Sequence, residues 1–476
     1  MADAPAPAPA LAGDFAPATT ADWRALVDKT LGESPYATIE TATVEGLRIA
    51  PLYAPADQSS APARAVPGDR AGEVATLTAH PDPDRANAEI LTDLRGGAAS
   101  TILRIDPTGQ AGVAIGSAAD LARALDGVIL EFAPVALDAG FLGPQAADWL
   151  AATAKASPGA LLRFHLDPFG AWATRGASPG PIEAHLVACA GAAARLADTY
   201  PRAQLFLASG RVAHEAGGGE ALEIAFATAA AIAYAKALVS AGLPMKKAFA
   251  SVTLGLSADA DYFLTIAKLR AARAVWARVA TACGADPVAR IEARSSRRML
   301  TARDAWTNMI RLTAAAFGAA VGGADTLVLG NFTDALGLPT EFARRQSRNA
   351  QLVLMEEAHI GRVADPAAGS GYVEAMTDQI ARAAWAQFQT IEAAGGIIAA
   401  LTSGHVARAV ATANAARPEP RIIGVTAFPP DKTQPVEVEI GAAKAVAAPS
   451  PRLPGPDSSC PPLAPMRIAE PFEVAA

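Results

Sequence analysis

Residues 336–378 read LGLPTEFARRQSRNAQLVLMEEAHIGRVADPAAGSGYVEAMTD, and this stretch predicts two helices joined by a tight loop. Thr340 is typical of a helix N-cap, and the acidic Glu341 follows in the first turn. Glycine and serine at 369–371 indicate the loop. Apolar residues then recur at helical spacing as far as WAQFQTIEAAGG at 385–396, which predicts a long second helix.

Outside this stretch, short β-rich runs alternate with helical patterns from about residue 70 to residue 415, for example helices at 118–125 and 182–196. Repeated βα units indicate a parallel sheet, and about seven such strands favour a closed (β/α)8 TIM-type barrel in the α/β class. An open doubly wound sheet is the alternative, but no Gly-x-Gly-x-x-Gly follows a first strand. The expected strands are 100–106, 128–132, 161–166, 204–209, 248–254, 290–293 and 326–329.

The pattern divides the chain into three parts. Residues 1–68 are expected to hold a disordered Ala/Pro leader (1–12) and an N-terminal association arm with one helix at 20–31. Residues 69–430 form the barrel. Residues 431–476 have the Pro-, Ser- and Ala-rich composition of a disordered tail.

Composition excludes several functions. The net charge of −7 and the dispersed Lys and Arg leave no basic stripe for nucleic acid. Three distant cysteines without a CxxC pair indicate a reducing compartment and argue against structural zinc. The start lacks the features of a secretory or organellar signal, and the apolar stretch 224–234 is too short to cross a bilayer. We therefore expect a cytoplasmic protein without a membrane segment.

Several ordered motifs resemble the methylmalonyl-CoA mutase family. The resemblance extends to residues 22–28, 46–53, 266–277 and 300–311, and it covers most of residues 15–430. It implies a barrel of an adenosylcobalamin-dependent isomerase that interconverts methylmalonyl-CoA and succinyl-CoA, with an N-terminal arm that wraps the neighbouring subunit. The motifs are Arg348-Asn349, Gln351, Glu356-Glu357, Arg362-Val363, Asp365-Pro366, Gly369-Ser370, Tyr372-Val373-Glu374 and the Glu392-Ala-Ala-Gly-Gly396 ending.

The family's cobalt ligand has no counterpart in the sequence. In the family a histidine in an Asp-x-His-x-x-Gly motif, on a separate flavodoxin-like domain, ligates cobalt. None of the histidines of this chain stands in that motif, so we expect no cobalamin to bind this chain alone. They are His80, His165, His185, His214, His359 and His405.

The resemblance also locates a degenerate active site. The family run Ser-Gly-Tyr-His-Met-Gln-Glu-Ala-Gly aligns with residues 209–217, which read SGRVAHEAG, so Val212 takes the place of the catalytic histidine. A valine side chain neither donates a hydrogen bond nor acts as a general acid. His214, two positions further, is the one candidate replacement. No catalytic, cofactor-binding or metal residue is therefore predicted; the predicted degenerate pocket comprises Ser209, Gly210, Arg211, Val212, Glu215, Asp325 and Val328.

Other polar groups of the family site are also replaced. The family strand Thr-Gln-Ser-Leu-His-Thr-Asn aligns with residues 324–330, ADTLVLG, and its Arg-Gly-Pro-Tyr loop has no counterpart near 62–69. The strands at 161–166, 204–207 and 327–329 carry bulky apolar residues on both faces, which favours a packed barrel interior in place of a passage for the pantetheine arm of CoA.

Three further constellations have simpler structural explanations. Glu356 and Glu357 are adjacent helical positions that diverge by about 100°, so they do not form a dyad. His165 and Asp167 end a predicted strand, but no nucleophile or metal partner is evident. The glycines at 217–219 are a weak phosphate-loop signal, because a loop with positive φ explains them equally well.

The sequence thus resembles the small, non-catalytic subunit of a heterodimeric methylmalonyl-CoA mutase. Its partner is expected to be a large catalytic subunit that binds adenosylcobalamin. Two alternatives remain: a mutase barrel that is active with a separately encoded cobalamin-binding chain, and a regulatory barrel that binds CoA without chemistry.

Overall fold

Eight short parallel strands form a closed barrel in the computed structural model, which describes residues 18–56, 62 and 72–473. Each strand pairs with the next along the chain, and β10 closes the ring by pairing with β3. The predicted (β/α)8 TIM-type barrel is therefore confirmed. The strands are β3 (Glu73–Thr78), β4 (Ser100–Arg104), β5 (Val135–Asp138), β6 (Leu162–Leu166), β7 (Gln204–Ser209), β8 (Val252–Ala258), β9 (Ile291–Ser295) and β10 (Thr326–Val328).

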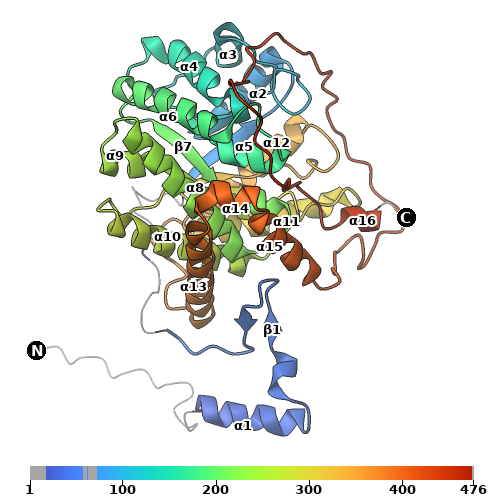
Figure 1. Cartoon of the computed structure of the whole chain (residues 1–476). Coiled ribbons are helices and arrows are strands. Elements are labelled where there is room, and N and C mark those ends of the chain that lie inside the picture. Colours follow the sequence, from blue (N-terminus) through green and yellow to red (C-terminus); the bar gives the residue numbers. More distant parts are fainter. Residues whose placement is uncertain (1–17, 57–61, 63–71, 474–476) are drawn as a thin grey trace, which may run out of the picture.

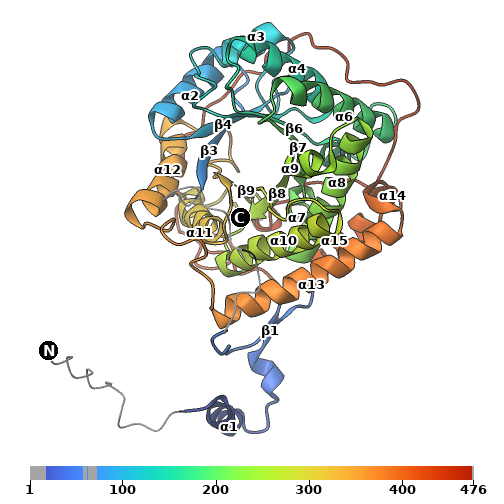
Figure 2. The same cartoon turned by 90° about the vertical axis from the view of Figure 1, so that its left-hand side faces the viewer.

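Helices surround the strands on the outside of the barrel, as Figure 2 shows. The main hydrophobic core lies between the outer faces of the strands and these helices, with Phe164, Trp172 and Trp276 among its largest buried side chains. The helices are α2 (Pro83–Arg95), α3 (Ala118–Ala124), α4 (Gly143–Thr153), α5 (Pro168–Arg175), α6 (Ile182–Thr199), α7 (Arg211–Glu215), α8 (Glu220–Ser240), α9 (Met245–Ala250), α10 (Tyr262–Ala282), α11 (Asn308–Val321) and α12 (Glu341–Leu352).

The helix pair predicted around residues 340–396 is confirmed. Thr340 caps α12 by accepting a hydrogen bond from the Ala343 amide, and α12 continues into a π-helical turn at Val353–Glu357. After the loop, α13 (Gly371–Ala393) packs across α8 and α10 on the outside of the barrel. The first residue of α13 is a glycine because a Cβ on Gly371 would lie 1.8 Å from the carbonyl oxygen of Ala54, where the arm crosses.

Two predicted strands are wrong in position, and one strand was missed. Residues 128–132 form a turn in which Phe132 is 83% exposed, and the strand begins after Pro134, at Val135. The predicted strand at 248–254 begins with the end of α9, so β8 starts at Val252. The missed strand, β3, reads EVATLT; polar residues interrupt its apolar ones, so it lacks the apolar run on which the prediction relied.

Strand alternation places charged side chains at both ends of the barrel interior around a small apolar cluster, whereas the bulky residues on both faces predicted an apolar interior throughout. In β6, Leu162, Phe164 and Leu166 belong to the main core under the helices. The alternate residues, Arg163 and His165, face the barrel interior and meet charged partners from other strands. The prediction failed because it treated both faces of the strand as apolar, although Arg163 and His165 lie on the face that points into the barrel.

The first helix of the N-terminal arm stands apart from the barrel. Thr19 and Asp22 form a capping box at the start of α1 (Thr20–Leu31), and α1 contains no buried residue. Figure 1 shows α1 below the barrel, joined to it by the short strands β1 (Thr41–Ala42) and β2 (Arg48–Ile49). The predicted helix at 20–31 is therefore confirmed, whereas the predicted leader at 1–12 lies outside the described residues.

The C-terminal segment is irregular but held in place, and this corrects the prediction of a disordered tail at 431–476 for the residues that the structure describes. After α14 (Gly396–Thr402) and α15 (His405–Ala415), it passes along one side of the barrel (Figure 1). Leu463 and Ala469 are buried, because apolar residues among the prolines find contacts on the barrel. Backbone hydrogen bonds join Val446 to Pro107, Leu453 to Pro179, Cys460 to Gly176, Met466 to Glu215 and Ile468 to Arg298.

Among the described residues, α8 is the one helix long and apolar enough to cross a membrane by length and composition. It packs between β7, β8 and the outer helices α6, α10 and α13. Most of its apolar window, 78%, is buried inside the protein, which is typical of a core helix.

Candidate functional site

The predicted pocket residues at 209–215 lie together where β7 ends and α7 begins. Ser209 is the last residue of β7, and the Gly210 amide donates a hydrogen bond to the carbonyl of Gly255 in the middle of β8 (2.9 Å). Arg211, Val212 and Glu215 follow in the short helix α7. This is the carboxyl end of the barrel strands, where catalytic groups of TIM barrels lie.

The side chain at the position of the family histidine is inert. Val212 is partly buried and packs against the main core. Its neighbour Arg211 approaches Arg294 of β9, and burial together with that like charge lowers the pKa of Arg211 to about 10. In the alignment expected from the resemblance, the cation Arg211 stands at the tyrosine position and the apolar Val212 at the histidine position.

Two other predicted pocket residues lie elsewhere in the barrel. Val328 sits inside it, in contact with Ala75, Ile102 and Ala136. Asp325 precedes β10 at the opposite, amino-terminal end, where its carboxylate accepts hydrogen bonds from Arg273 (2.9 Å) and the Ile291 amide (2.8 Å). The structure therefore separates Asp325 from the other pocket residues, because a strand of three residues spans the barrel between its two ends.

An ion pair closes the amino-terminal end of the barrel interior. Two nitrogens of Arg163 each lie 2.6 Å from an oxygen of Glu73, which is a bidentate arrangement. The same guanidinium reaches Thr326 at 3.4 Å, and Ser100 donates a hydrogen bond to Glu73. These side chains come from four different strands, so they occupy the axis at this level.

A second charged layer fills the carboxyl end. Arg294 binds Glu292 at 2.7 Å and Asp138 at 3.0 Å, and Arg104 lies 3.3 Å from the same Asp138 oxygen. Burial alone would raise the pKa of Asp138, but Arg104 and Arg294 outweigh it and hold this pKa well below its usual range. The sequence analysis predicted neither charged layer. The one available signal was that Glu292 and Arg294 are charged residues two positions apart in a strand, so they point to the same face.

His165 lies between these layers. Its side chain is 1% exposed, its Nδ1 is 3.6 Å from Glu292, and burial lowers its pKa to about 4. Its φ of 44° coincides with a register shift between β6 and β7, which indicates a bulge. Asp167, with which it was paired as a candidate, instead caps α5 and accepts a hydrogen bond from Tyr234 (2.6 Å). The two residues do not form one site.

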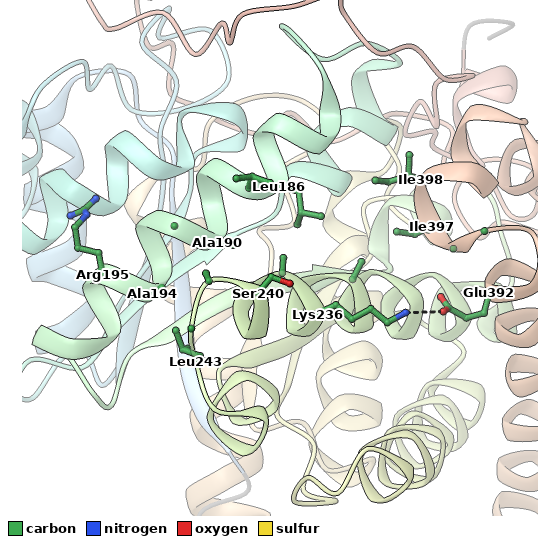
Figure 3. A pocket seen from close by; sticks show the side chains of 18 of the residues that line it. Leu186, Ala190, Ala194, Arg195, Lys236, Ser240, Leu243, Glu392, Ile397 and Ile398 are labelled. Atoms are coloured by element: carbon green, nitrogen blue, oxygen red, sulfur yellow. Dashed lines mark hydrogen bonds and ion pairs between the residues drawn. The ribbon is translucent and has the colours of Figure 1, made fainter.

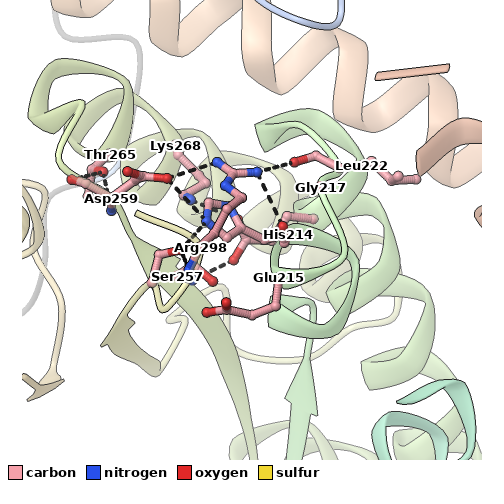
Figure 4. Close-up of polar contacts among 12 residues, drawn as sticks. His214, Glu215, Gly217, Leu222, Ser257, Asp259, Thr265, Lys268 and Arg298 are labelled. Atoms are coloured by element: carbon pink, nitrogen blue, oxygen red, sulfur yellow. Dashed lines mark hydrogen bonds and ion pairs between the residues drawn. The ribbon is translucent and has the colours of Figure 1, made fainter. Parts of the chain in front are cut away.

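His214, the candidate replacement for the missing histidine, is locked in a separate buried cluster (Figure 4). Its Nε2 lies 2.9 Å from the Ser296 hydroxyl, and its Nδ1 lies 3.2 Å from Glu223. The Glu223 carboxylate also binds Lys268 (2.7 Å). The His214 side chain is fully buried, and its Nε2 also lies 3.4 Å from Asp259, so both ring nitrogens have polar or charged neighbours within the cluster.

The other sequence candidates are exposed or have structural contacts. Glu356 and Glu357 are both exposed on the π-helical turn. The glycines at 217–219 do precede a helix, but the carboxylate of Glu45 already caps it, at 2.8 Å from the Ala221 amide and 2.9 Å from the Leu222 amide. This agrees with the simpler explanation of these glycines, because Gly217 has a φ of 107° and the arm supplies the anion at the start of this helix.

No group of three or more His, Cys, Asp or Glu in the described part of the chain could hold a metal ion. A groove of about 1020 Å³ does exist, but it lies on the outside of the barrel between α6, the end of α8 and the start of α14 (Figure 3). Lys236 and Glu392 form an ion pair across it (3.5 Å). The groove shares no residue with the predicted pocket.

Comparison with known proteins agrees with the resemblance. Residues 99–448 match the family model described as methylmalonyl-CoA mutase. The chain is 39% identical over 463 residues to the "Methylmalonyl-CoA mutase small subunit" of Streptomyces virginiae, a match that covers 90% of this chain and 73% of that protein. It is 35% identical to the small subunit of Propionibacterium freudenreichii subsp. shermanii, over 86% of this chain and 67% of that one. A "Probable methylmalonyl-CoA mutase small subunit" of Mycobacterium bovis is 38% identical, over 80% of this chain and 64% of its own length.

Proposed function

Because this chain belongs to the methylmalonyl-CoA mutase family, we propose that it is the small, non-catalytic subunit of a two-chain mutase of the isomerase class. Its matches span between 64% and 73% of the length of the small subunits compared above. In this proposal a large subunit carries out the isomerisation of methylmalonyl-CoA and succinyl-CoA, and this chain supports it.

The filled barrel axis is the observation that carries the proposal. A catalytic barrel of this family must admit the pantetheine arm of CoA along the axis, as the family resemblance implies. Here the Arg163–Glu73 pair and the Arg294–Asp138 pair occupy the two ends, and Val328 with Ile102 fills the middle. Opening this passage would break buried or half-buried ion pairs, which costs several kcal/mol when one partner is left alone.

The position of the family histidine supports the same conclusion. Val212 offers no proton, and His214 is engaged by Ser296 and Glu223 in a cluster that is closed to solvent. General acid catalysis needs a donor within hydrogen-bond reach of the reacting oxygen. Neither residue meets this requirement, so we assign the degenerate pocket no catalytic role.

The residues present do not fit adenosylcobalamin. The family is cobalamin-dependent, but the Asp-x-His-x-x-Gly motif does not occur in this sequence. The described residues after 415 run along the barrel as an irregular tail and form no α/β domain. We therefore assign the coenzyme to the partner and derive no step through it here.

The arm is the surface that we assign to the partner. A 12-residue helix without buried residues gains little stability alone, since isolated helices of this length are marginal in water. Leu26, on α1, is 64% exposed. Packing this helix on a second chain would bury that surface, and we propose a cytoplasmic heterodimer held in part by this contact.

Co-expression with a large mutase subunit tests the proposal. The large subunit should co-purify with a tagged form of this chain and stay with it in size-exclusion chromatography. Leu26→Asp should weaken the complex while leaving the barrel folded, because α1 does not contact the hydrophobic core. Ile440→Asp is the matched control, since Ile440 is 94% exposed but lies in the tail. Equal complex formation by all three proteins would refute the role of the arm, and no complex with the unaltered chain would refute the subunit assignment.

Two alternative functions can be distinguished from this proposal by simple assays. A barrel that is active with a separately encoded cobalamin-binding chain would show turnover in that mixture, which the filled axis argues against. A CoA-binding regulator would show a calorimetric signal with CoA esters on this chain alone.

A further inference from the structure

The C-terminal segment follows the carboxyl end of the barrel from loop to loop. Residues 439–473, which we call the strap, end in the short helix α16 (Glu470–Glu473) and are visible in Figure 1. The strap meets the connections after the strands in the same order in which the strands stand in the ring. Its contacts are Glu439 with Leu338 after β10 and His80 after β3, Val446 with Pro107 after β4, Cys460 with Gly176 after β6, Met466 with Glu215 after β7, and Ile468 with Arg298 after β9. The strap therefore goes around the end of the barrel that holds the predicted degenerate pocket.

Few side chains hold the strap to the barrel. Its buried residues are Cys460, Leu463 and Ala469, and most of the others are exposed. Backbone hydrogen bonds several residues apart supply the remaining contacts. Segments with few buried apolar contacts open at a lower free energy than core strands. We therefore expect the strap to open more readily than the barrel.

A carboxylate fastens the end of the strap. Glu473 accepts hydrogen bonds from the amides of Ala302 (2.6 Å) and Arg303 (3.2 Å), which lie in the loop after β9. It also pairs with Arg467 of the strap at 2.7 Å, and the side chains of Arg467 and Glu473 are 19% and 8% exposed. Hydrogen bonds to an ionised acceptor are stronger than those between neutral groups. Glu473 thus ties the strap to this loop.

The fastened end lies against the predicted degenerate pocket. The Met466 amide donates a hydrogen bond to the carbonyl of Glu215, a pocket residue on α7 (2.8 Å), and the Ile468 amide donates to the Arg298 carbonyl (3.0 Å). Ala469, next in the chain, is fully buried. A molecule that binds to α7 or to the loop after β9 at these points must first displace the strap.

We propose that the strap is a detachable lid, which opens from Cys460 to Glu473 as one unit while the barrel stays folded. Glu473 is its latch, because losing this contact frees the strap from the loop after β9 and leaves only backbone hydrogen bonds at Met466 and Ile468. A ligand or a second chain opens the lid only if it binds the open state more tightly than the closed one. This inference does not depend on the subunit role.

The cysteines of the chain report on this opening. Cys283 is exposed, Cys460 is buried in the strap, and Cys189 is buried in α6 of the barrel. The full-length chain is treated with excess N-ethylmaleimide under native conditions, and labelled peptides are quantified over time by mass spectrometry. We expect Cys283 to react first and Cys460 to react roughly tenfold or more faster than Cys189. Equal rates at Cys460 and Cys189 would mean that the strap opens only with the barrel, and would overturn the proposal.

Glu473→Ala tests the latch. It removes the acceptor of two amides and the partner of Arg467, so it should speed the labelling of Cys460 roughly tenfold or more. The matched control is Glu470→Ala, at an exposed glutamate of the same helix, which should leave the rate unchanged. Circular dichroism confirms that both variants are folded. If Cys460 reacts equally fast in Glu473→Ala and Glu470→Ala, Glu473 is not a latch and the proposal is overturned.

Discussion

Replacing Lys268 by methionine should strongly destabilise the protein, because it leaves a buried carboxylate without its cation. Lys268 and Glu223 are 1% and 0% exposed, and their charged atoms lie 2.7 Å apart. Methionine keeps most of the volume and removes only the charge. Breaking a buried pair from one side typically costs 3–5 kcal/mol, so we expect a loss of about 4 kcal/mol in the free energy of unfolding.

The neighbours of Glu223 make this loss hard to avoid. Burial alone would raise the pKa of Glu223, but Lys268 and then His214 outweigh it and hold this pKa at about 2. The carboxylate also accepts a hydrogen bond from the Ser257 amide, which fixes its position. It therefore cannot move to solvent when the lysine is absent.

Urea unfolding at pH 7 measures the effect through the transition midpoint. Lys236→Met is the control. Lys236 lies on the same helix as Glu223 and pairs with Glu392 at 3.5 Å, but its side chain is 72% exposed. An exposed ion pair of this kind contributes about 1 kcal/mol or less. The double variant Glu223→Gln/Lys268→Met should recover part of the loss. If Lys268→Met costs no more than Lys236→Met, the reasoning about the buried cluster is refuted.

Three further predictions follow from other parts of the molecule. The pKa of His165 is lowered to about 4 from 6.5, so the folded state binds fewer protons than the unfolded state between these values. The protein should therefore lose up to about 3 kcal/mol of stability as the pH falls from 6.5 towards 4. In urea titrations His165→Asn should reduce this dependence of stability on pH, whereas the control His359→Asn, at an exposed position, should not. Glu45→Ala should free the arm and the first turn of α8, which hydrogen exchange would detect as faster exchange at Ala221 and Leu222, while unchanged exchange would contradict the capping contact. Val212→His should not produce mutase activity, because the axis stays filled, and detectable turnover would contradict this.

Much of the fold could be predicted because it depends on local signals. Thr340 is a cap followed by an acidic first turn, and Thr20–Leu31 has a clear start and end, so both helices were found. The run at 128–132 misled because hydrophobicity alone does not distinguish a strand from an exposed turn before a proline.

The candidate site was harder to predict because it depends on contacts between distant strands. Val212 was identified by its alignment with a family motif, but Asp325 was grouped with it although the two lie at opposite ends of the barrel. Pairs such as Glu73 with Arg163 join residues ninety positions apart, and nothing local in the sequence indicates that they meet. The Glu45 cap likewise depends on how the arm crosses the barrel.

The central claim is that this chain supports a mutase without performing the chemistry. The most direct measurement is succinyl-CoA formation from methylmalonyl-CoA with adenosylcobalamin, by the isolated chain and by the chain combined with a large subunit. We predict no turnover by the isolated chain and turnover by the pair. Isomerisation by the isolated chain, free of any companion, would contradict the account.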